Sequence, residues 1–228
     1  MKKQRPKVLF FDVNETLLDL APMKKKMAHV LGGNGNLLSL WFTTLLQYTL
    51  VTSASGRYKD FVDIGAATLQ MVAANHGMAL TKKEARQSVS SSLLSLPAHP
   101  EVKGALTALK KAGYRLAAFT NGSNEGVKAQ FEFAGLTDHF EERLSVEDAG
   151  KSKPFGEAYE WAARTMNVDP EDCMMIAAHG WDVAGAQWAG WRAAFIERPG
   201  QQLFPLAPRA EIVETDLMKV ADILIEYR

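Results

Sequence analysis

The chain has 228 residues, of which 47% are hydrophobic, with 26 basic and 26 acidic side chains and a single cysteine. This length suits one compact domain or a domain that carries an insertion, and the hydrophobic fraction excludes an intrinsically disordered chain. The net charge of zero excludes a global basic field for nucleic acid or anionic membranes, and the lone Cys173 excludes an internal disulfide and a cysteine-based zinc cluster.

No apolar run approaches the roughly 20 residues that span a bilayer. The basic start of the chain is followed by the apolar run Val8–Phe11, which is shorter than the ~7–15 residues of a signal-peptide core. We therefore expect a cytoplasmic protein that binds neither membrane nor nucleic acid.

The first expected element is a buried parallel strand at Val8–Phe11, which ends at Asp12. From about Ala21 to Leu96 the pattern is helical, with breaks at small and glycine-containing segments, and no convincing strand is found. Within it, the segment that starts at Thr81 and has Glu84 three residues later is a capping box, which opens another helix.

Helices and strands alternate after Pro100. The expected helices are Val102–Ala112, Glu125–Ala134, Gly156–Met166 and Val183–Ala189. The expected strands are Arg115–Phe119, a short one within Phe140–Val146, Cys173–Ala178 and, as the last core strand, Arg192–Ile196. The charged segment Glu211–Arg228 is typical of an amphipathic surface helix.

This alternation predicts an α/β fold with a doubly wound parallel sheet. The helical block interrupts the alternation directly after the first strand, so we interpret it as an inserted helical cap. The predicted core domain comprises residues 1–18 and 97–228, and the predicted cap domain comprises residues 19–96.

Polar residues follow the predicted strands at the edge where such sheets place their active sites. They are Asp12, Thr120 with Asn121, Lys153, and His179 with Asp182. A polar residue at one strand end has a bland explanation, because loops between strands and helices are polar. Four clusters with complementary chemistry favour a site.

Four segments in this order resemble the motifs of the haloacid dehalogenase-like superfamily. They are Phe10–Asp19 with Asp12 at the end of the first strand, Phe119–Ser123, Lys153 followed by proline, and Ala177–Ala186. The resemblance covers residues 8–190 and implies a core of this fold with a cap after the first strand.

The resemblance also separates two kinds of chemistry. Phosphatases of the superfamily have a second Asp two residues after the nucleophile, where this chain has Asn14. An amide cannot donate a proton as a general acid and is a weaker Mg²⁺ ligand than a carboxylate. The pair Trp181-Asp182 and the small residues after it are similar to the L-2-haloacid dehalogenase branch, which implies a reaction without metal or cofactor.

In that branch an aspartate displaces halide from C2 of a 2-haloalkanoate, and water cleaves the resulting ester. The resemblance implies that Asp12 is the nucleophile, that Lys153 keeps it ionised and binds the substrate carboxylate, and that Asp182 orients Lys153 or water. Lys151 competes with Lys153 for this role, but the Lys-Pro step and Tyr159 favour Lys153. The expected substrate-binding residues are Val13, Asn14, Thr16, Trp41, Phe42, Thr120, Asn121, Tyr159 and Trp181.

Among these, Thr120 and the backbone amides after Asp12 are expected to bind the substrate carboxylate, and Asn121 to donate toward the departing halide. The chain departs from the branch at Phe42, where a halide-binding Arg is expected, so a strong anion donor is missing. An aromatic cradle of Trp41 and Phe42 is the expected replacement.

A second departure places His179 where the branch commonly has an Asn. An imidazole can take a proton from water near neutral pH. We therefore expect a dyad in which Glu15 holds the other ring nitrogen of His179, and His179 activates the water that cleaves the Asp12 ester.

The leading hypothesis is an (S)-2-haloacid dehalogenase that forms (R)-2-hydroxy acids from a small-molecule substrate, as a homodimer. The alternatives are a Mg²⁺-dependent phosphatase of the same superfamily, which would use Asp12 and Asp182, and a non-catalytic module that keeps the fold.

Overall fold

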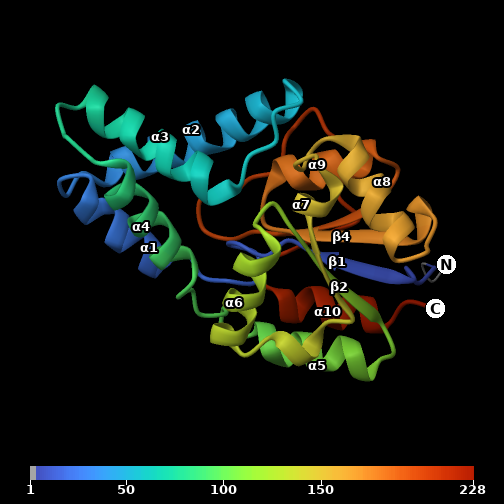
Figure 1. The fold of residues 1–228 in the computed structure, drawn as a ribbon. Helices are drawn as coiled ribbons and strands as arrows, with labels where there is room; N and C mark the ends of the chain where they lie inside the picture. Colours follow the sequence, from blue (N-terminus) through green and yellow to red (C-terminus); the bar gives the residue numbers. More distant parts are fainter. Residues whose placement is uncertain (1–3) are drawn as a thin grey trace.

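The computed structural model describes residues 4–228, and residues 1–3, the first of the basic N-terminal stretch, lie outside the described residues. Within residues 4–228, six strands form one parallel sheet in the order β3-β2-β1-β4-β5-β6. Their bounds are β1 Val8–Phe11, β2 Arg115–Thr120, β3 Glu142–Ser145, β4 Cys173–Ala177, β5 Arg192–Ile196 and β6 Ile212–Glu214. The predicted α/β fold with a doubly wound parallel sheet is confirmed (Figure 1).

Helices cover both faces of this sheet. Figure 1 shows α5 and α10 on one side and α8 and α9 on the other, with α1 to α4 grouped at one end of the molecule. The bounds after the cap are α5 Val102–Lys111, α6 Asn124–Ala134, α7 Val146–Ala149, α8 Gly156–Thr165, α9 Gly180–Trp188 and α10 Leu217–Ile225.

The side chains of β1 alternate between the two faces, as the period of two in a strand requires. Leu9 and Phe11 pack into the cluster that contains the residues of α5, α10 and the inserted helices. Val8 and Phe10 pack into the opposite cluster, against α8 and α9. The central strand therefore buries both faces, which explains its continuous apolar run.

The helices of the inserted block are α1 Ala21–Val30, α2 Gly35–Ala54, α3 Phe61–Asn75 and α4 Lys82–Leu93. The capping box at Thr81 is confirmed, since its hydroxyl accepts from the backbone of Glu84 and the Glu84 carboxylate accepts from the backbone of Thr81. The chain enters the block after Leu18 and leaves it before Ala98, and these two residues pair in an isolated antiparallel β-bridge. Because the bridge closes the block at its base, we propose residues 19–96 as the cap and residues 1–18 and 97–228 as the core.

One prediction for the C-terminal part is wrong. Arg192–Ile196 is not the last strand, because β6 pairs with β5 in parallel inside the segment expected to be helical throughout. The helix begins only at Leu217, and it buries Leu217, Val220 and Leu224 against the core. The run in β6 is too short to be recognised as a strand from its sequence pattern.

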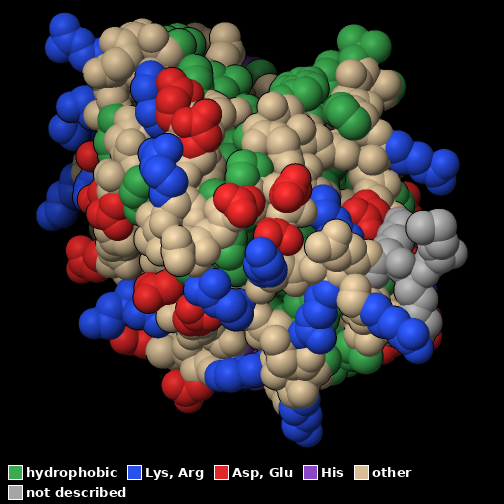
Figure 2. Space-filling view, turned by 90° about the vertical axis from the view of Figure 1, so that its right-hand side faces the viewer, with side chains coloured by type: hydrophobic (Ala, Val, Ile, Leu, Met, Phe, Trp, Pro, Cys, Tyr) green, Lys and Arg blue, Asp and Glu red, His purple; other side chains and the backbone are tan. Residues whose placement is uncertain are grey.

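Charges of both signs intermingle on the face shown in Figure 2, in keeping with the net charge of zero. Of the helices within residues 4–228, none combines the length and the apolar character that a membrane crossing requires.

Candidate functional site

Asp12 follows β1 directly and is only 5% exposed. Its Oδ1 lies 3.1 Å from Nζ of Lys153, and its Oδ2 lies 3.0 Å from Nδ1 of His179. Thr16 donates its hydroxyl to the same Oδ2 over 2.8 Å. The carboxylate predicted as nucleophile is therefore buried, held at both oxygens, and in contact with two cationic or potentially cationic groups.

Lys153 precedes α8 and is 1% exposed. Its ammonium donates to Asp12, to Oδ2 of Asp182 over 2.6 Å and to the backbone oxygen of Phe119 over 2.8 Å. An ammonium has three N–H groups, so these three acceptors use all of them. In this arrangement no N–H of Lys153 remains free for the substrate carboxylate, and that expected role of Lys153 stays a prediction. Lys151 donates to a backbone oxygen of the cap instead, so Lys153 is the lysine beside the nucleophile.

Asp182 lies in the first turn of α9 and is fully buried. Its Oδ1 accepts from the hydroxyl of Tyr159 over 2.6 Å, and its Oδ2 accepts from Lys153. Tyr159, expected to bind substrate, is itself fully buried behind Asp182. Tyr159 thus holds Asp182, and Asp182 contacts Lys153, which is compatible with the orienting role predicted for Asp182.

The charges in this cluster determine which groups are ionised. Burial alone raises the pKa of Asp12, but Lys153, His179 and Thr16 outweigh it and hold that pKa well below its usual range. Burial lowers the pKa of Lys153, but Asp12 and Asp182 raise it above its usual value. Burial and the charge of Asp12 raise the pKa of Asp182. Asp12 is therefore an ionised carboxylate at neutral pH, as a nucleophile must be.

His179 begins α9 and lies between two carboxylates, with Nδ1 toward Asp12 and Nε2 3.5 Å from Oε2 of Glu15. The structure therefore brings together the two residues predicted as a dyad. Burial lowers the pKa of His179, but the hydrogen bond with Asp12 and the negative charges of Asp12 and Glu15 raise it to about 9. The imidazole is thus protonated at neutral pH while Asp12 carries its charge.

Glu15 has a left-handed backbone, with φ of 66°, a conformation that costs a non-glycine residue on the order of 1–3 kcal/mol. Its backbone oxygen accepts from Nε2 of His99 over 3.0 Å, and its carboxylate accepts from Lys24 and Gln201, each over 2.9 Å. Sequence reasoning missed these three residues. Lys24 stands in a run of three lysines, and His99 and Gln201 belong to no motif, so no signal in the sequence distinguishes them.

A small apolar cavity of about 160 Å³ lies beside Lys153. It is lined by Leu46, Thr49, Leu50, Asn121, Lys153, Pro154 and Trp181. Trp181 stacks on His179, with ring centroids 5.3 Å apart. Asn121 exchanges two hydrogen bonds with the backbone of Lys153, which leaves one N–H of its amide for another acceptor.

The aromatic pair expected to cradle the halide divides into two different roles. Trp41 is fully buried and donates its indole N–H to the backbone oxygen of Gly65 inside the cap. Phe42 is partly exposed and stacks on His179, with ring centroids 6.5 Å apart. The structure therefore places Phe42 at the catalytic cluster, whereas Trp41 is part of the cap interior.

Three other residues expected to contact substrate are fully buried or nearly so: Val13, Thr16 and Thr120. The hydroxyl of Thr16 donates to Asp12 and accepts from the backbone of Ala178, so it positions the nucleophile instead of facing a substrate. The hydroxyl of Thr120 accepts from the backbone of Gly122 and can still donate.

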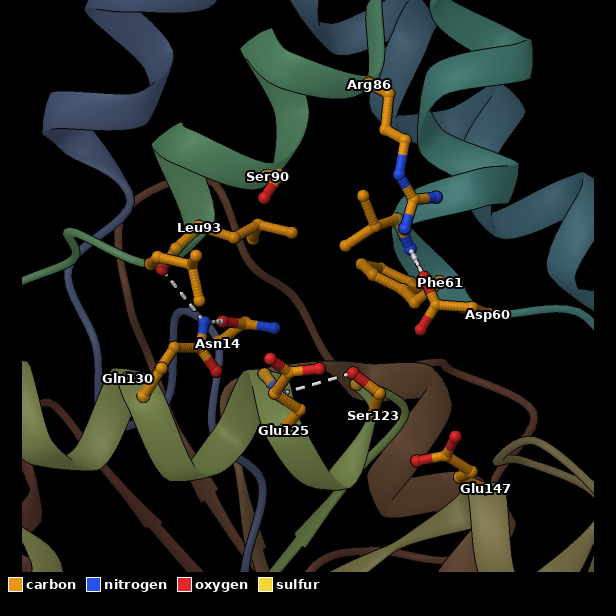
Figure 3. Close-up of a pocket in the computed structure, with 15 residues that line it drawn as sticks. Asn14, Asp60, Phe61, Arg86, Ser90, Leu93, Ser123, Glu125, Gln130 and Glu147 are labelled. Carbon is orange, nitrogen blue, oxygen red and sulfur yellow. Dashed lines mark hydrogen bonds between the residues drawn. The ribbon is translucent and has the colours of Figure 1, made fainter.

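Asn14 turns its side chain into a separate cleft between the cap and α6 (Figure 3). The cleft measures about 410 Å³. The amide of Gln130 donates to Oδ1 of Asn14 over 2.9 Å and to the backbone oxygen of Leu93 in the cap. Gln130 therefore joins the cap to the core, and the side chain of Asn14 supports Gln130 in this position; the expected contact of Asn14 with substrate stays a prediction.

Comparisons with known proteins agree with the geometry of the site. The family model described as haloacid dehalogenase-like hydrolase matches residues 6–190. The protein named (S)-2-haloacid dehalogenase 1 of Pseudomonas sp. (strain CBS-3) is 30% identical over 201 residues, which cover 87% of this chain and 88% of that one. Haloacetate dehalogenase H-2 of Moraxella sp. (strain B) is 30% identical over 83% of this chain and 85% of its own.

Solved structures agree in fold. The L-2-haloacid dehalogenase RSc1362 matches with a TM-score of 0.90 and 25% identity, over 97% of this chain and 99% of that chain. The L-2-haloacid dehalogenase of Xanthobacter autotrophicus, solved with chloropropionic acid covalently bound, matches with a TM-score of 0.89 and 20% identity, over 96% of this chain and 98% of that chain. The resemblance drawn from the four sequence motifs is confirmed.

Proposed function

Because the chain belongs to the haloacid dehalogenase-like hydrolases, we propose that it is an (S)-2-haloacid dehalogenase, which converts small 2-haloalkanoic acids to (R)-2-hydroxy acids and halide. The observation that carries this proposal is the ionised, buried carboxylate of Asp12, held by Lys153 and His179, where Lys153 also lines a small apolar cavity. The relatives named (S)-2-haloacid dehalogenase support the same substrate class.

In the first half-reaction a carboxylate oxygen of Asp12 attacks C2 of the substrate from the side opposite the halogen. The new C–O bond forms as the carbon–halogen bond breaks, the halide leaves with the bonding electrons, and C2 inverts. Lys153 and Thr16 hold Asp12 in place for this attack. The chloropropionic acid bound covalently in the Xanthobacter structure supports a covalent route.

The alkyl chain of the substrate fits the cavity beside Lys153, whose volume of about 160 Å³ suits a short chain. The free N–H of Asn121, which lines this cavity, is the group that we assign to the departing halide. Phe42, expected to cradle the halide, lines a different cavity beside Glu15. The hydroxyl of Thr120 and the backbone amides of Val13 and Asn14 are the donors that we assign to the substrate carboxylate, since the N–H groups of Lys153 are all engaged.

The second half-reaction uses the dyad of His179 and Glu15. Formation of the ester removes the negative charge of Asp12, which is one of the two charges that raise the pKa of His179. The imidazolium then releases its proton and becomes a general base. Neutral His179 takes a proton from water, the hydroxide attacks the ester carbonyl of Asp12, and collapse of the adduct returns the Asp12 carboxylate and the hydroxy acid.

The runner-up function, a Mg²⁺-dependent phosphatase, has less support. The ammonium of Lys153 bridges Asp12 and Asp182, so the protein itself supplies the positive charge between these carboxylates. Asn14, at the position of the second phosphatase aspartate, is bonded to Gln130 and cannot act as a general acid. A non-catalytic module would have no use for a buried, ionised carboxylate that is held between a lysine and a histidine.

One assay separates these functions. The protein is incubated with (S)-2-chloropropionate, (S)-2-bromopropionate or p-nitrophenyl phosphate, each with EDTA and with Mg²⁺. We expect halide release that EDTA does not reduce. Phosphate release that needs Mg²⁺, without halide release, would refute the dehalogenase proposal.

A variant tests the route. His179→Asn should still release one halide per enzyme and then stop, with the Asp12 peptide heavier by the mass of the 1-carboxyalkyl group, which is the substrate without its halogen. If the variant turns over at the wild-type rate, His179 is not the base.

We also propose a cytoplasmic location and a homodimer. The single cysteine accords with a reducing compartment. Three apolar side chains of α2, Leu40, Leu50 and Val51, are between 42% and 47% exposed and could be buried in a dimer. Light scattering of the purified protein tests the dimer.

A further inference from the structure

Glu15 is held from three directions. The cap contributes Lys24 in α1, whose Nζ lies 2.9 Å from Oε1 of Glu15. The loop after β5 contributes Gln201, whose amide donates to Oε2 over 2.9 Å. The same Oε2 faces Nε2 of His179 at 3.5 Å. The orientation of the Glu15 carboxylate toward His179 therefore depends on a lysine of the cap.

On the side where it contacts Lys24, Glu15 faces a cavity that is open to solvent. A cavity of about 300 Å³ is lined there by Glu15, Lys24, Phe42 and Gln201, together with other residues of α1, α2 and the loop after β5. The cavity beside Lys153 and Trp181 shares no lining residue with it. The side chain of Lys24 is 49% exposed, whereas that of Glu15 is 7% exposed. His179 is therefore connected to solvent through Glu15, on a side that is separate from the cavity assigned to the alkyl chain.

The charged side chains form a row that alternates in sign from Lys24 through Glu15, His179, Asp12 and Lys153. Ester formation neutralises Asp12 and leaves an extra positive charge on the Lys24 side of the row. The net charge of the row returns to its earlier value when His179 loses its proton to solvent. This proton is the one that hydrolysis of a carbon–halogen bond releases in each turnover.

We propose that Lys24 is a positioning residue for the hydrolysis half-reaction, acting through Glu15 on the solvent side of His179. This inference rests on the proposed dehalogenase function and goes beyond it. Lys24 keeps the Glu15 carboxylate charged and oriented, and its own positive charge favours the departure of the proton from His179 once Asp12 is esterified.

Other charged groups near the dyad do not replace Lys24. Asp12 loses its charge in the intermediate, and Lys153 stays paired with Asp182. His99 contacts the backbone of Glu15 and not its carboxylate. Arg198 donates to the backbone of Thr16 and to Glu101. Within residues 4–228, Lys24 is therefore the cation, besides His179 itself, that is ion-paired with the Glu15 carboxylate.

The test follows the two half-reactions separately in Lys24→Met. Enzyme is mixed rapidly with (S)-2-bromopropionate from pH 5.5 to 9.5; bromide release reports ester formation, and quenched mass spectrometry reports ester decay. We expect the acid limb of ester decay to move to higher pH by about half a unit, which is about threefold in rate at a fixed acidic pH. The bromide burst should keep its rate.

Two variants complete the experiment. Lys24→Arg keeps the charge and should restore the wild-type profile, and Lys25→Met changes an exposed lysine of the same helix and should leave both steps unchanged. A Lys24→Met profile that superimposes on wild type overturns the inference, as does an equal loss in both half-reactions or a failure of Lys24→Arg to restore the profile. Absence of bromide release from the wild type would instead overturn the proposed function, and the inference with it.

Discussion

Replacement of His179 by asparagine removes a buried group whose charge depends on pH. In the folded protein the pKa of His179 rises from the ordinary 6.5 to about 9, because the effect of Asp12 and Glu15 exceeds that of burial. A group with a raised pKa stabilises the fold fully below its unfolded pKa, and this stabilisation disappears as the pH rises through its folded pKa. The pH range over which the stabilisation by His179 is lost therefore extends from about pH 6.5 to above pH 9.

The rise from 6.5 to about 9 corresponds to about 3 kcal/mol of folding free energy. We expect the free energy of unfolding of the wild type, measured by urea denaturation, to fall by at least about this amount between pH 6.5 and pH 10. Over the same range His179→Asn should fall by about 3 kcal/mol less than the wild type. Its remaining fall comes from groups such as Cys173, whose pKa burial raises to about 12 and which ionises first in the unfolded chain. His99 and His139 do not interfere, since their pKa values are lowered and they titrate below this range.

The control is His29→Asn, which changes an exposed histidine of α1 and should retain the wild-type dependence on pH. A wild-type stability that stays constant from pH 6.5 to pH 10 would refute the argument that His179 is held protonated between two carboxylates. So would an equal fall in His179→Asn, because the titrating group would then lie elsewhere.

Three further substitutions test other parts of the site. Asp12→Asn should reduce halide release at least about a thousandfold, because an amide is a poor nucleophile; mass spectrometry should find no ester. Lys153→Met should destabilise the fold by about 3–5 kcal/mol in urea denaturation, since it leaves Asp12 and Asp182 buried without a cation; a loss below 1 kcal/mol would contradict the bridging role. Gly185→Ala should cost about 1–3 kcal/mol, because its Cβ would lie 2.5 Å from Cβ of Pro154; wild-type stability would mean that α9 shifts freely.

The local elements could be read from the sequence because their signals are local. The continuous apolar run of β1 follows from burial on both faces, and the capping box at Thr81 follows from a bond between residues three apart. The strand β6 was not predicted because three residues carry too little periodicity, and because its pairing with β5 is a long-range contact.

The sequence predicted which charged residues lie together, but it predicted less of their geometry. Asp12, Lys153 and Asp182 follow strands of one parallel sheet, so the topology brings their positions to the same edge. The sequence could not say that three acceptors would use every N–H of Lys153, or that Tyr159 would lie behind Asp182. Those facts depend on how α8 and α9 pack.

The sequence by itself determined the fold class and the family, and it singled out Asp12 as the candidate nucleophile, because these follow from periodicity and from short motifs in a definite order. Only the tertiary structure decided what surrounds Glu15. Lys24 and Gln201 reach its carboxylate from segments 9 and 186 residues away, and His179 lies between it and Asp12. Such contacts arise where the cap and two loops meet, and no local pattern encodes that meeting.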